Sequence, residues 1–260
     1  GQSMWVAELR FKIIADTHYQ QAETALRGYL ESLIFNGQIL GREFPTHLLQ
    51  DEFIARVIIP TQDALHTSWH RQPGLKALQQ LATGGLAYPS AEILGMDLMS
   101  NHTDPCDDSA AYVLYCRFAQ MNSVVYCAEH LAPIPLFKIP PAYGVDHEDL
   151  VRWQLQYQAL DEIQMQQQSV LLGPAERALQ NLNSKLNRQG RQFAKQLTSK
   201  LGKPVYYALY RGTSSDCATE AQRQCPSCKG EWLRKTPLAD LFDFQCDRCL
   251  LVSNIAWQCQ

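Results

Sequence analysis

The chain has 260 residues, of which 46% are hydrophobic and 19% charged, a composition typical of a globular protein and not of a disordered or collagen-like chain. No apolar run approaches the roughly 20 residues of a membrane-spanning helix, and no secretory signal is recognisable. We therefore expect a soluble, cytoplasmic protein without a membrane partner. The net charge of −3 conceals an asymmetry, because residues 1–176 carry 10 basic and 20 acidic side chains whereas residues 177–260 carry 13 and 6.

The first hundred residues alternate between strand-like and helix-like hydrophobic periods. The expected elements are a strand at 5–13, a helix ending near Gly37, strands at 39–44 and 53–59, a short helix ending at Gly84, and a strand at 93–99. The order β-α-β-β-α-β predicts a ferredoxin-like domain over residues 4–100. The overall fold class is therefore α+β.

The rest of the chain divides into three further stretches. Residues 101–145 are predicted to hold a hairpin (112–118 and 124–127) and a proline-rich, extended connection. Residues 146–203 are predicted to form a helical hairpin broken at Gly173, with its second helix running from about 175 to 201. Residues 204–260 are expected to contain a strand followed by a C-terminal zinc ribbon.

Four cysteines near the C-terminus carry the most specific signal. Cys225 and Cys228 form one Cys-x-x-Cys pair, Cys246 and Cys249 form another, and 17 residues separate the pairs, which is the spacing of a zinc ribbon. Four thiolates leave no coordination position for water, so the spacing predicts one structural Zn²⁺ ion and no hydrolytic one. Iron fits the same four sulfurs. A redox motif or structural disulfides at these positions are disfavoured by the repeat of the pair.

Other cysteines give weaker signals. Cys127-Ala-Glu-His130 has the form of half a metal site, with Cys116 on the facing strand of the hairpin and Cys106 further upstream. A second metal site built from Cys116, Cys127 and His130 is one interpretation, and small buried side chains are the favoured one. Cys217 and Cys259 receive no functional role.

A run of basic residues precedes the cysteine pairs. Between Arg177 and Arg211 there are eight basic side chains and no acidic one. On a helix, the leucines and Phe193 of this stretch form one stripe, and the opposite face carries the candidate nucleic-acid-binding residues Arg177, Lys185, Arg188, Arg191 and Lys195. RNA or DNA phosphate is one partner for such a face. An acidic protein, or the acidic part of this or another copy of the chain, is the other.

Known catalytic signatures are absent. The sequence has no glycine-rich phosphate loop, no His-Glu-x-x-His and no nucleophile elbow, so we do not expect an enzyme. An enzymatic reading would need a deep pocket lined by His66 or His70.

The order of several motifs resembles one known family. The matching features begin at Trp153 and end at Asn254, and include Pro204-Val-Tyr-Tyr207 and both cysteine pairs. They resemble a family of uncharacterised bacterial proteins described as containing a zinc ribbon and as candidate nucleic-acid binders. The resemblance implies a bacterial cytoplasmic protein with zinc at the four cysteines, and no established activity. Lys229 departs from the glycine that often follows such a pair. Two hypotheses result: a zinc-ribbon protein that binds nucleic acid through its basic helix, or a zinc-stabilised adaptor that binds an acidic protein.

Overall fold

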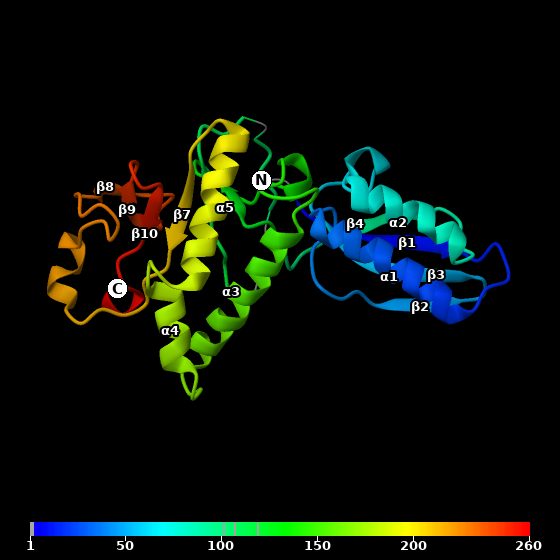
Figure 1. Ribbon diagram of the computed structural model, residues 1–260, viewed down its shortest axis with the longest axis horizontal. Helices are drawn as coiled ribbons and strands as arrows, with labels where there is room; N and C mark the ends of the chain where they lie inside the picture. Colours follow the sequence, from blue (N-terminus) through cyan, green and yellow to red (C-terminus); the bar gives the residue numbers. More distant parts are fainter. Residues whose placement is uncertain (1–2, 101, 107, 119) are drawn as a thin grey trace. The chain divides into compact units, whose positions relative to one another are not determined.

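The computed structural model describes residues 3–100, 102–106, 108–118 and 120–260. The chain is mixed α+β, with two sheets and several helices (Figure 1). It divides into two compact units. The first comprises the residues up to Pro105 with Met121–Ser123 and Ala132–Glu148, and the second comprises the remainder. Among the described residues, no helix combines the length and apolar character needed to cross a membrane.

The first unit is a four-stranded antiparallel sheet with two helices. Its elements are β1 (Trp5–Lys12), α1 (Tyr19–Phe35), β2 (Thr46–Leu49), β3 (Glu52–Ile59), α2 (Gln72–Thr83) and β4 (Ser90–Met96). The strand order is β2-β3-β1-β4. Alternate residues of β1, namely Ala7, Leu9 and Phe11, are buried in one core with α1 and α2, as the period-2 pattern requires.

Two parts of the first unit differ from the sequence-based expectation. The strand expected at 39–44 is replaced by β2 further along the chain, and Leu40 makes only an isolated bridge to Ile58. Gly41, with φ of +120°, ends the extended path there. The proline-rich connection is also packed, because Phe137 joins the core of this unit. The guanidinium of Arg71 donates a 2.7 Å hydrogen bond to the carbonyl of Ile139.

A buried polar network lies beneath α1. The Gln38 side-chain amide donates to the Ala64 carbonyl at 2.8 Å and lies 3.0 Å from Nδ1 of His70. Since the amide nitrogen is a donor, Nδ1 must accept and the ring proton must sit on Nε2, which lies 2.8 Å from the Tyr29 hydroxyl. Burial lowers the pKa of His70 to about 4. The network therefore holds His70 neutral.

The neutral state of His70 makes the stability of the chain depend on pH. An unfolded histidine titrates near pH 6.5, so between pH 6.5 and 4 the unfolded chain binds more protons than the folded chain. Stability is complete above this window and is lost as the pH falls through it. At pH 5 the loss from His70 is about 2 kcal/mol relative to pH 8. Urea unfolding at both pH values should show this loss in the wild type and a correspondingly smaller loss in His70→Gln; equal losses would contradict the assignment.

The second unit contains a six-stranded sheet assembled from distant parts of the chain. Its strands are β5 (Tyr112–Leu114), β6 (Val125–Cys127), β7 (Val205–Leu209), β8 (Leu233–Leu238), β9 (Phe242–Cys246) and β10 (Leu251–Ser253). The order is β6-β5-β7-β10-β9-β8, and β7 runs parallel to both of its neighbours. The predicted hairpin and the C-terminal strands thus share one sheet.

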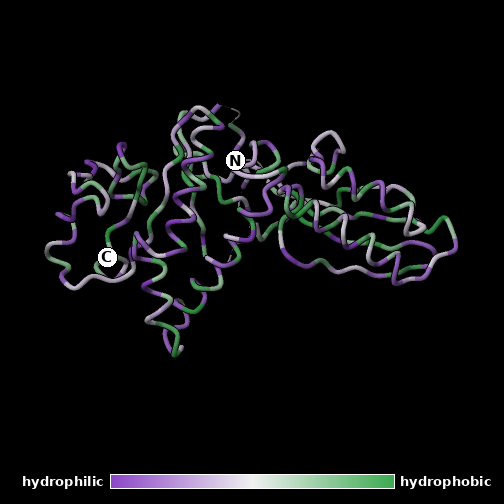
Figure 2. The backbone as a smooth tube through the Cα atoms, viewed as in Figure 1, coloured by the Kyte–Doolittle hydropathy of each residue, from purple (hydrophilic) through white to green (hydrophobic). Residues whose placement is uncertain are grey.

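Three helices belong mainly to this unit: α3 (Glu148–Gln166), α4 (Leu172–Gln180) and α5 (Lys185–Leu201). The continuous helix expected at 175–201 is wrong, because the chain leaves the helical path at Asn181 and α5 begins after Ser184. The Ser184 hydroxyl accepts from the Asn187 amide at 3.1 Å and caps α5. Figure 2 shows hydrophilic and hydrophobic positions interleaved along the helices. Short 3₁₀ helices complete the fold at Thr67–Trp69, Leu136–Lys138, Cys217–Gln222 and Trp257–Cys259.

Helix α5 packs very closely on β7. The fully buried Asn187 donates to three carbonyls at the end of α4 and accepts a 2.6 Å hydrogen bond from the Tyr207 hydroxyl. Gly190 lies one turn further along, where an added Cβ would come within 2.3 Å of the Tyr207 ring and 2.6 Å of the Trp153 ring. These contacts fix which face of α5 points away from the sheet.

Replacing Gly190 by alanine should destabilise the protein despite the higher helix propensity of alanine. The propensity gain is about 1 kcal/mol, whereas forcing a methyl group between two packed rings costs about 1–3 kcal/mol. Gly28→Ala is the matched control, because Gly28 also lies inside a helix and has no atom within 4 Å of its would-be Cβ. Thermal denaturation should show Gly190→Ala less stable and Gly28→Ala slightly more stable than the wild type. A stabilised Gly190→Ala would mean that the close packing is absent.

Candidate metal centre

Two turns of the second unit bring the four C-terminal cysteines together. Cys225 and Cys228 lie in the turn before β8, whereas Cys246 ends β9 and Cys249 lies in the turn between β9 and β10. Their sulfur atoms lie within 4.8 Å of one another, and the sulfurs of Cys228 and Cys246 are 3.7 Å apart. Zn–S bonds of about 2.3 Å in a tetrahedron place sulfurs about 3.8 Å apart. These four side chains could therefore hold a metal ion.

The backbone of the two turns supports thiolate ligands. The amides of Gly230 and Cys249 donate to the sulfurs of Cys228 and Cys246, each at 3.4 Å. The Lys229 amide donates to the Cys225 carbonyl at 2.8 Å, and Lys229 itself has φ of +64°. Lys229 therefore adopts the left-handed conformation for which glycine was expected.

The protonation of the free thiols differs across the cluster. The amide of Gly230 lowers the pKa of Cys228 to about 7, whereas burial raises the pKa of Cys246 to about 12. Burial also raises the pKa of Cys225. A bound divalent ion would have to displace the protons of the buried thiols, because metals bind the thiolate.

A small core surrounds the metal centre. The Trp232 and Phe244 rings stack 5.0 Å apart, and the Arg223 guanidinium lies 4.6 Å from the Phe244 ring centroid. Arg223 also pairs with the buried carboxylate of Glu220 at 2.9 Å, and Arg211 pairs with the same carboxylate at 3.3 Å. Two cations thus compensate one buried anion, as burial of a charge requires.

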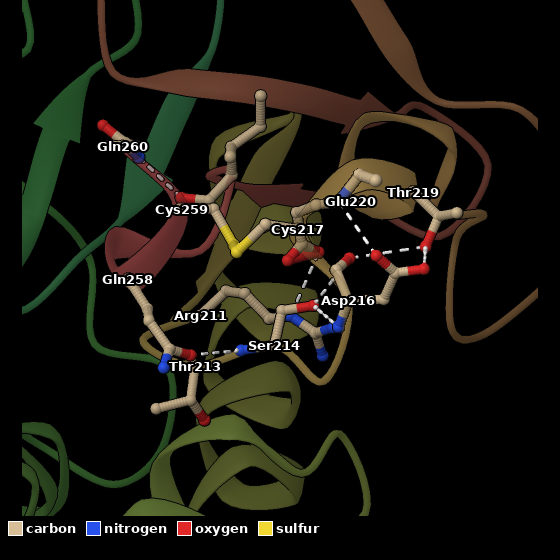
Figure 3. Close-up of a disulfide and its surroundings, with 12 residues drawn as sticks. Arg211, Thr213, Ser214, Asp216, Cys217, Thr219, Glu220, Gln258, Cys259 and Gln260 are labelled. Carbon is tan, nitrogen blue, oxygen red and sulfur yellow. Dashed lines mark hydrogen bonds and ion pairs between the residues drawn. A yellow bond between two sulfur atoms is a disulfide. The ribbon is translucent and has the colours of Figure 1, made fainter.

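A disulfide joins Cys217 to Cys259 beside this ion-pair cluster (Figure 3). The sequence analysis gave these two cysteines no role, so the structure adds a covalent constraint on the C-terminal segment. The bond encloses all four cysteines of the metal cluster and spans a sequence separation of 42 residues. The backbone amide of Ser214 donates to the Gln258 side chain at 3.1 Å next to it.

Removing the disulfide should lower the stability of the C-terminal segment. In the chain-entropy model, closing a loop of this length contributes about 4 kcal/mol. A metal ion that already joins the two cysteine pairs shortens the effective loop to about 20 residues and the contribution to about 3 kcal/mol. Urea unfolding of Cys217→Ser, followed by tryptophan fluorescence, should show a free energy of unfolding about 3–4 kcal/mol lower than that of the wild type. Reduced wild type should match the variant. Full alkylation of Cys217 in unreduced wild type would exclude the bond.

Three of the five predicted basic residues line a groove next to the metal centre. The groove has a volume of about 550 Å³ and is lined by Arg188, Arg191 and Lys195 of α5 together with Ser227, Arg248 and Cys249 of the two cysteine turns. None of the described residues that line it is acidic. Arg177 lies on α4 and Lys185 begins α5; both are exposed and neither lines the groove.

The remaining candidate residues have different surroundings. Cys116 is buried, and burial raises the pKa of its thiol well above the usual value. Nδ1 of His130 lies close to the sulfurs of both Cys127 and Cys106. The hollow of about 840 Å³ between α1 and β2 in the first unit is lined by neither His66 nor His70. The buried network described above accounts for His70.

The sequence analysis missed several features of this region. Arg248 and Ser227 reach the groove only because β10 pairs with β7, a contact between segments 44 residues apart. The spacing of Cys217 and Cys259 has no recognised motif. Neither position could have been assigned without the tertiary fold.

Comparisons with known proteins place the chain in a family. Three family models match it in succession, each described as a domain of unknown function: DUF8589 over residues 4–95, DUF2310 over 106–210 and DUF8594 over 214–259. The groove residues of α5 lie within the second match, and the four cysteines lie within the third. No solved structure matches the chain.

The chain is thus a mixed α+β protein with a four-cysteine cluster able to hold a metal ion. It belongs to the same family as an uncharacterised protein of Haemophilus influenzae, to which it is 33% identical over 259 residues, covering 98% of this chain and 99% of the relative. A second uncharacterised protein of Haemophilus influenzae is 35% identical over 173 residues, covering 66% of this chain and 85% of that protein.

Proposed function

We propose that the protein is a zinc-ribbon protein that binds the phosphate backbone of RNA or DNA in the groove between α5 and the cysteine turns. In this proposal the ribbon is the segment from Cys225 to Ser253, and one Zn²⁺ ion stabilises it without taking part in catalysis. The four-thiol donor set and the 3.7 Å sulfur separation support zinc. We place the protein in the bacterial cytoplasm, whose reducing conditions keep four thiols available for a metal ion but disfavour the Cys217–Cys259 disulfide of the structure.

The first unit is proposed to be ferredoxin-like. The strand order β2-β3-β1-β4, with α1 following β1 and α2 following β3, supports this assignment. No catalytic role is proposed for it.

The observation that carries the nucleic-acid proposal is the lining of the groove. Four cationic side chains converge there, three from α5 and Arg248 from the second cysteine turn. Within the second unit, none of the ion pairs found among the described residues involves these four side chains. An external anion is therefore their natural counter-charge.

The negative charge of a metal-bound cysteine cluster would balance only part of this positive charge. A divalent ion with four thiolates carries a net charge of about −2. The four groove side chains carry four positive charges, about two more than are needed to balance the metal-bound cluster. A chain of phosphates, with one negative charge per nucleotide, supplies the balance.

The proposed binding is largely independent of base sequence. Trp232 and Phe242 are each 3% exposed, because Trp232 stacks on Phe244 and Phe242 packs in a core with Val113 and Tyr206, so neither ring is free to stack on bases. The groove side chains that remain are phosphate binders. Tyr207, the aromatic residue named among those lining the groove, is only 1% exposed, so the groove favours backbone contacts over base reading.

The test is an electrophoretic mobility assay with duplex DNA, single strands and structured RNA at several salt concentrations. If four phosphates are neutralised on a duplex, the slope of log affinity against log salt is about −3.6. The triple variant Arg188→Glu, Arg191→Glu, Lys195→Glu should bind weakly. Its slope should lie between about −1 and 0, because at most one phosphate contact remains.

The matched control reverses three basic residues of the same helical region that do not line the groove, namely Arg177, Lys185 and Lys200. Its net charge equals that of the first triple variant, so long-range electrostatics affects both equally. The control should keep the wild-type slope. Equal weakening of both variants would contradict the groove, and negligible binding by the wild type would favour the adaptor that binds an acidic protein.

A further inference from the structure

A second group of metal-ligating side chains lies in the second unit, outside the four-cysteine cluster. Nδ1 of His130 is 3.3 Å from the sulfur of Cys106 and 3.6 Å from the sulfur of Cys127. Zinc bonds of about 2.3 Å to sulfur and about 2.0 Å to nitrogen, at a tetrahedral angle, separate the two ligand atoms by about 3.5 Å. Each of the two observed separations therefore suits a sulfur and a nitrogen bound to one ion.

The backbone around Cys127 and His130 repeats the form of a cysteine turn of the ribbon. The Leu131 amide donates to the Cys127 carbonyl at 2.8 Å, and Leu131 has φ of +46°. In the first ribbon turn, the Lys229 amide donates to the Cys225 carbonyl at the same distance, and Lys229 has φ of +64°. Both turns place two ligands three residues apart and a left-handed residue directly after the second ligand.

The second ribbon turn shares this left-handed residue. Leu250, which follows Cys249, has φ of +52°. Among the described residues other than glycine, seven have positive φ, and three of these seven directly follow a ligand-x-x-ligand pair. A leucine rarely adopts this conformation, because its Cβ clashes with the backbone. Its recurrence therefore indicates that the turn is shaped by the ligand pair.

Burial of small cysteines does not account for the group. Cys127 is fully buried, but Cys106 is only half-buried and His130 is exposed. A partly exposed thiol and an exposed imidazole gain little hydrophobic free energy from meeting. Cys116, by contrast, is buried, as a small apolar side chain would be.

The location also separates this group from the ribbon. Cys127 ends β6, which is one edge of the six-stranded sheet, whereas Cys246 ends β9 near the other edge. The strands β5, β7 and β10 lie between β6 and β9 in the sheet. Two ions would thus bind at opposite edges of one sheet.

We propose that Cys106, Cys127 and His130 bind a second divalent ion with a preference for thiolate and imidazole ligands, with Zn²⁺ as the expected ion. The three side chains supply two sulfurs and one nitrogen, so a fourth position is left to water or to another donor. Such an ion exchanges more readily than one held by four thiolates, because fewer protein ligands must be released. The site does not depend on the groove or on nucleic-acid binding.

The test counts zinc bound to the full chain. Reduced protein is dialysed anaerobically against a low micromolar concentration of free Zn²⁺, and bound zinc is measured by mass spectrometry, so that an exchangeable ion is retained and counted. The wild type should bind two ions per chain. His130→Ala and Cys106→Ser should each bind one, and the control Cys116→Ala should keep two.

The same count in a variant that lacks the ribbon site distinguishes the two metal sites. Cys249→Ser removes one ligand of the four-cysteine cluster and should reduce the count from two to one. Adding His130→Ala should then remove the remaining ion. One ion in the wild type that His130→Ala leaves unchanged overturns the proposal, and so does a count of two that persists in both His130→Ala and Cys106→Ser.

Discussion

The packing of α5 on Tyr207 is the constraint on which the second unit depends. Gly190 allows the helix axis to approach the aromatic ring, and the buried Asn187 binds both the Tyr207 hydroxyl and the end of α4. Because β7 carries β10 on its edge, the same packing places the outer face of α5 next to the turn that contains Cys249. A side chain at position 190 would therefore disturb the groove as well as the core.

This arrangement gathers part of the basic charge of residues 177–260 in one groove. Arg188 and Arg248 are 60 residues apart in sequence, yet both line one groove. Arg177 and Lys185 belong to the same basic run and lie outside it. A helical wheel drawn through the whole run misplaces Arg177, because it assumes one continuous helix and the chain breaks between α4 and α5.

The sequence predicted what depends on local periodicity and spacing. The alternation of Ala7, Leu9 and Phe11 and the spacing of the cysteine pairs are contained in short segments, and both are found in the structure. What was not predicted depends on long-range pairing. The parallel pairing of β7 with β5 joins residues about 90 positions apart, and the Cys217–Cys259 bond closes a long loop. Neither contact leaves a pattern in its own neighbourhood.

Lys229 and Leu250 adopt the left-handed conformation directly after the two cysteine pairs, where glycine would avoid strain. A residue other than glycine in the left-handed region costs of order 1 kcal/mol. Binding of a structural zinc ion contributes about 10–16 kcal/mol in small zinc domains, so the two strained residues together cost only a small part of the gain. A side chain there can instead extend the surface around the cysteine cluster, as Leu250 does by lining the groove beside Arg248.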